Sequence, residues 1–388
     1  MKKSIISSAL KVISGAMVIA FAAILPLFPL SCKLSDDDST ESESTSSENA
    51  NKETENPVSN GKCSAIDEKT IRLEIAEGFS LVNGSISVSE KDSSEAITEI
   101  EDIVDAETEN VKKIVLKSET EVGKTYVLSG SATDSDEKTY DFSYDFTGYN
   151  KNMARLILSE VRTEYKKTQS AAEFIEFYAL KGGNLCGLEF ACASKVTKAS
   201  GEQIYKFPDI KVKTGDYITV HLRTLEDGSI NEINGDCTES TAPDSHDSAW
   251  DLWIDGSEDK LVTQFDVILL RNSESYIYDA LLMADSSKIE WKNTFYQDFA
   301  NKASKSGIWV GGEYVKNAVD VSASNSYLRS VSRQDIQELS EKYSDGTKIP
   351  DIIQNEKSKW IVTASKTKKN PDIGATPGYK NSTTPIGN

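Results

Sequence analysis

Every second position is apolar in several short stretches after residue 60, which predicts β-strands. In residues 70–76, Ile71, Leu73 and Ile75 occupy alternate positions, and residues 141–145 alternate in the same way. Because the side chains of a strand point to opposite faces in turn, this pattern indicates strands with one buried face. Glycine, asparagine and aspartate between the stretches are typical of turns. Residues 63–149 are therefore predicted to fold as an antiparallel β-sandwich.

The same region resembles the bacterial immunoglobulin-like modules in the order of its residues. Leu116 closes one predicted strand, Gly123 follows a polar stretch, and Tyr126 comes shortly before the final hairpin. The resemblance implies an immunoglobulin-like arrangement of the strands in residues 63–149.

Strand patterns continue after residue 150, where two long insertions interrupt them. The predicted strands cover residues 154–161, 173–178, 215–220, 266–270 and 277–280, and the last two form a hairpin. The first insertion, residues 223–260, is strongly acidic, and the second covers residues 286–326.

Two helices are predicted in the last third of the chain. Residues 287–305 carry apolar side chains such as Ile289 and Phe299 at helical spacing, so we expect an amphipathic helix there. Residues 333–343 show the same spacing, and Ser332 is a suitable N-cap for a helix that begins at this point.

Several short motifs follow one another between residues 153 and 381. They are Glu160-Val161, Glu173-Phe174-Ile175-Glu176-Phe177, Leu185-Cys186-Gly187, Gly215-Asp216-Tyr217, Ser326-Tyr327-Leu328-Arg329, Trp360, and Thr376-Pro377-Gly378 followed by Asn381. This succession resembles the lamin-tail domain, an immunoglobulin-like sandwich of bacterial secreted and surface proteins. The resemblance implies that residues 150–388 form a second immunoglobulin-like sandwich, so the expected fold class is all-β.

The lamin-tail resemblance also singles out three carboxylates. Glu160, Glu173 and Glu176 match the strand carboxylates of that family. We expect a structural role for them, in ion pairs with residues such as Arg155 or in the protection of a sheet edge.

The N-terminus has the pattern of an export signal. Met1-Lys2-Lys3 is followed by an almost uncharged apolar run at residues 12–30, and Ser31 precedes Cys32. This ending resembles the box at which bacterial lipoproteins are lipidated and cut, with Pro29 in place of the usual leucine. Residues 1–31 are therefore predicted to be a signal peptide and Cys32 the lipid-anchored residue. Ordinary cleavage near Ser31 and retention as a membrane helix are the alternatives.

Residues 32–62 are predicted to be a disordered acidic tether. Serine, threonine, asparagine and acidic residues dominate this stretch, so it cannot bury enough apolar surface to offset its chain entropy. A tether behind a lipid anchor would hold the folded part clear of a membrane. We therefore expect the cell envelope as the location, with the outer membrane or the cell surface favoured over the inner membrane.

The charge balance restricts the class of partner. The chain carries 43 Lys and Arg against 62 Asp and Glu, a formal net charge of -19. Non-specific binding to nucleic acid requires a cationic surface, and the cluster Lys366, Lys368 and Lys369 is too small to supply one. We therefore expect a membrane lipid at Cys32 and a protein or glycan as partners, and no nucleic acid.

Four cysteines follow Cys32, namely Cys63, Cys186, Cys192 and Cys237. In an oxidising compartment they allow two disulfides with three connectivities, and the sequence does not choose among these. Cys63 lies outside the second predicted domain, which leaves the other three to compete for one bridge.

The sequence offers few groups for catalysis. Its two histidines are His221, predicted on the polar face of a strand, and His246, predicted in a loop. The sequence contains no nucleophile-elbow, P-loop or zinc-protease motif. We therefore expect no enzyme and no cofactor. A hydrolase within the insertions is the competing hypothesis, and it would need His221 or a pair of carboxylates in a cleft.

The acidic insertion suggests two binding hypotheses. Clustered carboxylates at 223–260 would suit calcium, although their spacing is not that of an EF-hand, and a solvated acidic loop is the alternative. Trp250 and Trp253 could form an aromatic platform for a sugar or peptide, with core packing as the alternative. The predicted function is an exported, lipid-anchored adhesin or envelope scaffold. The competing function is an accessory module of an envelope hydrolase or nuclease.

Overall fold

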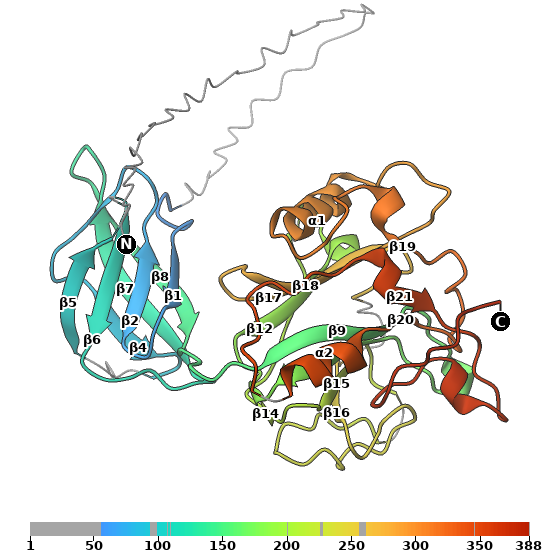
Figure 1. The fold of residues 1–388 in the computed structure, drawn as a ribbon. Helices are drawn as coiled ribbons and strands as arrows, with labels where there is room; N and C mark the ends of the chain where they lie inside the picture. The colour runs from blue at the N-terminus through green and yellow to red at the C-terminus, as the bar shows by residue number, and fades with distance from the viewer. Residues whose placement is uncertain are drawn as a thin grey trace, which may run out of the picture. The chain divides into compact units, whose positions relative to one another are not determined.

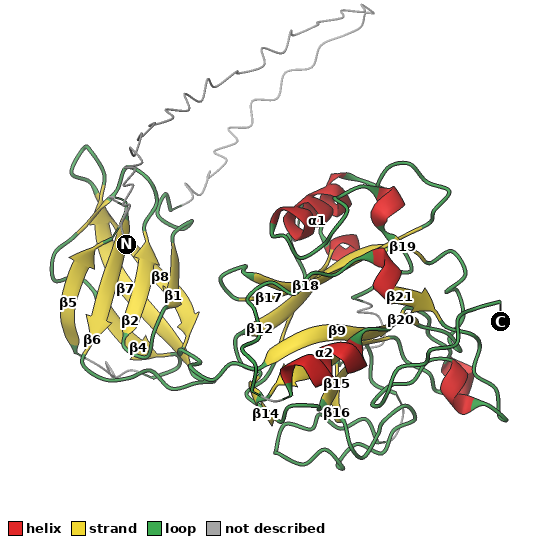
Figure 2. Cartoon of the chain, viewed as in Figure 1, coloured by secondary structure: helices red, strands yellow, loops and turns green. Residues whose placement is uncertain are grey.

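The computed structural model describes residues 56–93, 99–106, 108, 110–199, 201–225, 228–255, 261–344 and 346–387. Cys32, the predicted signal peptide and the predicted tether up to residue 55 lie outside the described residues. Within the described part the chain forms twenty-one strands and two α-helices, so the fold is all-β (Figure 2).

Residues 56–149 form two sheets that share one hydrophobic core. The first sheet has the order β1-β2-β6-β5, and in the second β7 pairs with β8 on one side and with β3 and β4 on the other. The strands are β1 (Lys62–Ala65), β2 (Thr70–Glu74), β3 (Ser80–Leu81), β4 (Ser87–Glu90), β5 (Ile100–Asp105), β6 (Val111–Leu116), β7 (Thr125–Thr133) and β8 (Thr139–Thr147).

The alternation of apolar residues explains how these two sheets pack. In β2, Ile71 and Leu73 are buried and their neighbours are not, and in β8 Phe142, Tyr144 and Phe146 are the buried positions. Side chains from both sheets belong to one buried cluster. The strands predicted from this alternation are therefore confirmed as elements.

Residues 150–388 contain a six-stranded and a five-stranded sheet with a common core (Figure 1). The six-stranded sheet has the order β16-β15-β10-β9-β20-β21, the five-stranded sheet has the order β13-β12-β17-β18-β19, and β11 pairs with β14. The strands are β9 (Arg155–Arg162), β10 (Phe174–Lys181), β11 (Gly183–Asn184), β12 (Leu188–Cys192), β13 (Ile204–Lys206), β14 (Lys211–Val212), β15 (Tyr217–His221), β16 (Trp250–Trp253), β17 (Asp266–Asn272), β18 (Ile277–Ala284), β19 (Val319–Asp320), β20 (Val331–Arg333) and β21 (Trp360–Val362).

The six-stranded sheet is buried on both faces. Every residue of β9 is buried, and so is every residue of β10 before its last. On β10, Ile175 and Phe177 point into the core between the two sheets, whereas Tyr178 packs in a second cluster against α2. We call the face that carries Tyr178 the outer face of this sheet.

The two α-helices begin later than the sequence predicts. Helix α1 is Thr294–Lys305, because Asn293 caps it by accepting from the backbone N–H groups of Phe295 and Tyr296. The predicted start at residue 287 is therefore wrong, and Ile289 lies in the loop before the helix.

Helix α2 is Ile336–Tyr343, and Asp335 stands at its N-cap. The predicted start at residue 333 is also wrong, because Ser332 and Arg333 belong to β20 and are held by pairing with β21. Short 3-10 helices occur at η1 (Lys167–Gln169), η2 (Ala193–Lys195), η3 (Val315–Asn317), η4 (Lys357–Lys359) and η5 (Pro371–Ile373).

Two sequence-based questions are answered by the described residues. Cys63, Cys186, Cys192 and Cys237 all carry free thiols, so none of the disulfides that the sequence allows is formed. Neither α-helix of the described part is long and apolar enough to cross a membrane.

Candidate functional site

Charged and polar side chains are concentrated on the outer face of the six-stranded sheet, where they are buried. Three parts of the chain cover this face: α2, the segment 375–382 and the acidic insertion. A buried polar group must find its hydrogen-bond partners within the protein. The partners of these side chains therefore show which contacts hold each covering segment on the sheet.

Glu160 on β9 and Glu176 on β10 are paired in the register of the sheet, and both are fully buried. Glu160 accepts hydrogen bonds from the Ser330 hydroxyl and from the backbone N–H and hydroxyl of Thr376. Glu176 accepts hydrogen bonds from the Thr219 hydroxyl at 3.2 Å and the Gly378 N–H at 2.6 Å. The two carboxyl groups therefore fix the segment 375–382 on the sheet.

The burial of this pair changes its protonation. Burial raises the pKa of Glu160 to about 7, although hydrogen bonds from Ser330 and Thr376 act in the opposite direction. Burial first, and the negative charge of Glu160 second, raise the pKa of Glu176. The pair therefore retains a proton at a pH at which an exposed glutamate has lost its own.

Asn381 completes this attachment. Its side-chain amide donates to the carbonyl oxygens of Ser159 and Arg333, both at 2.9 Å, and its Oδ1 accepts from the Ser159 hydroxyl. The motif Thr376-Pro377-Gly378 followed by Asn381 thus supplies the donors that the two glutamates and β9 require.

The acidic insertion is held by a second set of carboxylates. Asp251 on β16 lies 2.7 Å from Nε2 of His221 and accepts from the His246 N–H, and Glu232 accepts from the N–H groups of Asp251 and Ser240. Burial raises the pKa of Glu232 to about 7. These side chains point into the domain.

His221 lies on a strand and on its outer face, as the alternation predicts. This face is expected to be polar and exposed, but at His221 it is buried. The acidic insertion covers His221 completely, and the imidazole ring stacks on Trp253 at 3.8 Å between centroids. His246 is half-buried in a loop, where its Nδ1 lies 2.9 Å from the Ser248 hydroxyl. The hydrolase hypothesis that uses His221 requires an accessible imidazole, and the imidazole of His221 is buried.

Trp250 and Trp253 do not form the predicted aromatic platform. Their exposed fractions are 8% and 3%, because the insertion folds back over β16. The indole N–H of Trp250 donates to Asp216, and that of Trp253 donates to the Ser240 hydroxyl. Trp250 belongs to the main core and Trp253 to a small buried cluster beneath the insertion.

Two buried arginines, Arg162 and Arg223, form ion pairs in this region: Arg162 with a residue of the acidic insertion and Arg223 with the residue just before β10. The Arg162 guanidinium pairs with Asp244 and lies over the Phe174 ring. Burial alone would raise the pKa of Asp244, but the charge and hydrogen bond of Arg162, together with the charge of Lys366, outweigh burial and lower it. Glu173 pairs with Arg223 through two hydrogen bonds of 2.6 and 2.8 Å. Glu173 thus has the ion pair expected for it. Its partner is not Arg155, because Arg155 donates to the carbonyl oxygens of Tyr278 and Asp351.

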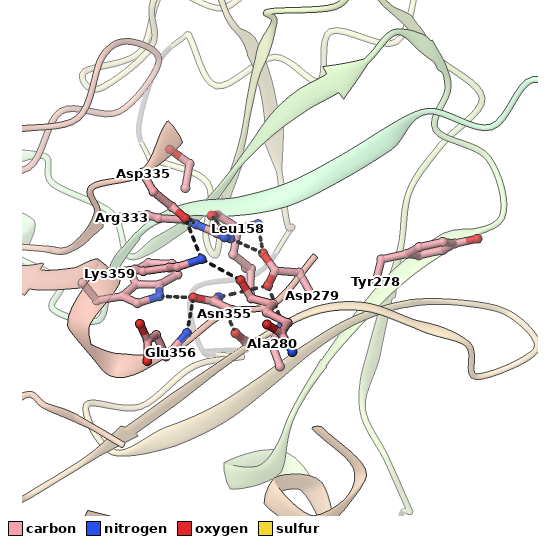
Figure 3. Close-up of polar contacts among 12 residues, drawn as sticks. Leu158, Tyr278, Asp279, Ala280, Arg333, Asp335, Asn355, Glu356 and Lys359 are labelled. Carbon is pink, nitrogen blue, oxygen red and sulfur yellow. Dashed lines mark hydrogen bonds and ion pairs between the residues drawn. The ribbon is translucent and has the colours of Figure 1, made fainter. Parts of the chain in front are cut away.

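A further polar network joins the two sheets (Figure 3). Arg333 is about 1% exposed, and its guanidinium donates to Asp279 on β18 and to Asp335, both at 2.6 Å. Asp279 also accepts from the Leu158 N–H and from the amide of Asn355. Burial would lower the pKa of Arg333, but the two aspartates outweigh burial and raise it.

The sequence did not identify this network or Glu232. The predicted helix 333–343 includes Arg333, and Asp279 and Asn355 stand in no motif. One signal was present: a single aspartate within the otherwise apolar stretch 277–284 indicates a buried partner of opposite charge.

The described residues contain no group of three or more histidine, cysteine or acidic side chains that could hold a metal ion. Within the acidic insertion, Glu232 and Asp251 point inward and accept from backbone N–H groups. Residues 226, 227 and 256–260, which include four acidic side chains, lie outside the described residues.

The fold and this site define an all-β protein whose larger sheet is closed by its own insertions and C-terminal segment. A family model described as a protein second domain, TP_1001_2nd, matches residues 154–362. The match covers more than half of the chain, and the chain belongs to this family.

Parts of the chain are similar to a curated relative and to solved structures. An uncharacterized protein of Treponema pallidum (strain Nichols) is 31% identical over 163 residues, which are 42% of this chain and 39% of the relative. The chain thus matches well under half the length of that relative.

Among solved structures, the N-terminal part of the bacterial S-layer protein SbsC is 18% identical, with a TM-score of 0.22, over 37% of this chain and 36% of that chain. A DUF4876 family protein from Bacteroides thetaiotaomicron is 13% identical, with a TM-score of 0.25, over 67% of this chain and 84% of that chain.

Proposed function

We propose that this protein is an exported, lipid-anchored binding or scaffold protein of the cell envelope. Its second domain would be a lamin-tail-like module, and Cys32 would be the anchored residue. Two features support export and anchoring: the apolar run at residues 12–30 and the serine before Cys32. Location at the outer membrane or cell surface is part of the same proposal.

One observation carries the choice of a binding or scaffold role. The buried charged side chains of this domain, Glu160, Glu173, Glu176, Asp251 and Arg333, all contact other parts of the same domain. Such contacts give a rigid platform on which loops can be displayed, because each covering segment is fixed by charge-assisted hydrogen bonds.

Metabolic labelling with a clickable fatty acid tests the anchor in cells that express the full chain. We expect the wild type to be labelled and Cys32→Ala to lose the label, while Cys63→Ala retains it as the matched control. Label that persists in Cys32→Ala would refute lipidation at this residue.

Protease digestion of intact cells tests the location. A surface protein loses its folded domains to added protease without cell lysis, and a protein that is digested only after lysis would contradict the surface location. Chemical cross-linking on the same cells then identifies the partner. Recovery of an envelope hydrolase or nuclease would favour the accessory role over an adhesin or scaffold.

A further inference from the structure

Four apolar side chains near α1 are exposed, although the domain beneath them has a full core. Ile289 is 90% exposed, Tyr314 57%, Ile352 45% and Val310 39%. They lie on the loop before α1, on the chain that follows α1, and on the chain that follows α2. We call these four residues the apolar patch.

Contacts between three segments bring the parts of the chain that carry the patch together. The indole N–H of Trp291 donates to the carbonyl oxygen of Glu313 at 2.6 Å, which joins the loop of Ile289 to that of Tyr314. The Val310 N–H donates to the carbonyl oxygen of Asn355 at 2.8 Å. A Cβ placed on Gly307 would lie 3.6 Å from the Ile352 side chain. Residues 288–292, 305–317 and 352–357 are therefore neighbours.

The exposed charges of these segments are mainly positive. Lys288, Lys292, Lys305, Lys316 and Lys357 are exposed, and the acids of the same segments are the exposed Glu290 and the partly exposed Glu313 and Glu356, with the exposed Asp351 next to Ile352. Lys316 lies over the Tyr314 ring, and the Lys357 ammonium donates to the Lys316 carbonyl oxygen. In a chain of net charge -19 this surface differs in sign from the molecule as a whole.

We propose that the apolar patch is a docking surface for a phospholipid membrane with anionic headgroups. Ile289 protrudes from the sequence Lys288-Ile289-Glu290-Trp291-Lys292, so its side chain can enter the acyl region while the lysines reach the phosphates. Trp291 and Tyr314 are amphipathic rings of the kind that favour the interface between lipid and water. An exposed apolar cluster among cations is stabilised at such a surface, and it needs no shaped protein partner.

The acidic remainder of the chain does not prevent this contact. At physiological ionic strength charges are screened over about 8 Å, so headgroups respond mainly to the side chains nearest to them. The inference goes beyond the proposed function, since the lipid on Cys32 would attach the chain, whereas the patch would hold the second domain itself against the headgroups.

Vesicle flotation tests the patch without the anchor. The chain from Lys33 onward retains both hydrophobic cores, because the buried residues of each begin at Val58 or later. We expect it to float with phosphatidylcholine vesicles that contain phosphatidylglycerol, and to bind less to pure phosphatidylcholine. Ile289→Ser should lower the partition coefficient about tenfold, and Lys292→Gln about fivefold on the anionic vesicles alone.

Ile230→Ser is the matched control, because Ile230 is 45% exposed but lies on the acidic insertion. It should bind as the wild type does. Brominated lipids give a second measurement: they should quench the fluorescence of Trp291, and Trp291→Phe should remove the quenching, since the other four tryptophans are buried.

Three results would overturn the proposal. They are a wild type that floats with neither vesicle, an Ile289→Ser variant that binds as the wild type does, and a patch that mediates self-association in sedimentation experiments in place of lipid binding. Each leaves fatty-acid labelling of Cys32 unaffected, so the anchor and the patch can fail separately.

Discussion

At the scale of single residues, the second domain depends on charged groups that are removed from water. A carboxyl group in this position favours its protonated form, and an arginine there requires carboxylates around it. Glu160 and Arg333 represent the two cases. Each yields a prediction.

Glu160 makes stability depend on pH in an unusual direction. Its folded pKa of about 7 lies above the unfolded value of 4.5, so the folded state binds more protons between these values and loses stability as the pH rises through 7. Glu232, also at about 7, and Asp266, at about 6, act in the same direction. We expect a higher melting temperature at pH 6 than at pH 8, and Glu160→Gln should reduce this difference. A melting temperature that rises from pH 6 to pH 8 would contradict the assignment.

Arg333 should be among the most sensitive positions of the domain. Arg333→Met leaves the buried carboxylate of Asp279 without its cation, and we expect a loss of about 3–5 kcal/mol in the free energy of unfolding. Chemical denaturation measures this loss. Arg72→Met is the control, because the pair of Arg72 with Glu74 is more than 40% exposed on both sides and should contribute about 0–1 kcal/mol. Equal losses from the two variants would refute the role of burial.

At the scale of elements, the sequence predicts strands better than the ends of helices. Alternation found β2, β8, β9, β10, β15 and the hairpin β17–β18, because each has a face in a core. It misplaced the start of α1, since the cap at Asn293 is a local hydrogen bond that the apolar pattern does not contain. Alternation also does not predict what covers the outer face of the six-stranded sheet, because the covering segments are distant in the sequence and leave no periodic pattern in it.

The segment 375–382 shows how much one position can depend on such coverage. Gly378 has a φ of 86°, and a Cβ there would lie 2.4 Å from the Cβ of His246. Gly378→Ala should therefore destabilise the domain by roughly 2–4 kcal/mol, through backbone strain and this clash together. Gly235→Ala is the control, because its φ of 93° is similar and its Cβ would meet nothing within 4 Å. It should cost about 1 kcal/mol. Denaturant titration compares the two, and equal effects would show that the contact with His246 is irrelevant.

At the scale of the whole molecule, the described chain has two main cores with no residue in common. One core contains Leu128 and lies in residues 58–146, and the other contains Leu269 and lies in residues 154–362. Domains that have separate hydrophobic cores commonly unfold as separate cooperative units.

We therefore expect two unfolding transitions in calorimetry of the chain from Lys33 onward. Leu128→Ala should lower one transition and Leu269→Ala the other, each by about 2–5 kcal/mol, because both side chains are completely buried. A single transition that both variants shift would show that the two cores unfold together.

The attachment of Thr376 to Glu160 spans 216 positions of the chain, and it has a consequence for biogenesis. If the chain is exported from its N-terminus, as we propose, β9 and β10 emerge long before the residues that donate hydrogen bonds to their carboxyl groups. During this interval the larger sheet is incomplete, and its acidic groups keep water on a surface that later becomes dry. Under the proposed export, secretion would be the stage at which the chain is most open to envelope proteases, and premature termination before residue 375 would produce a molecule that stays in that vulnerable form.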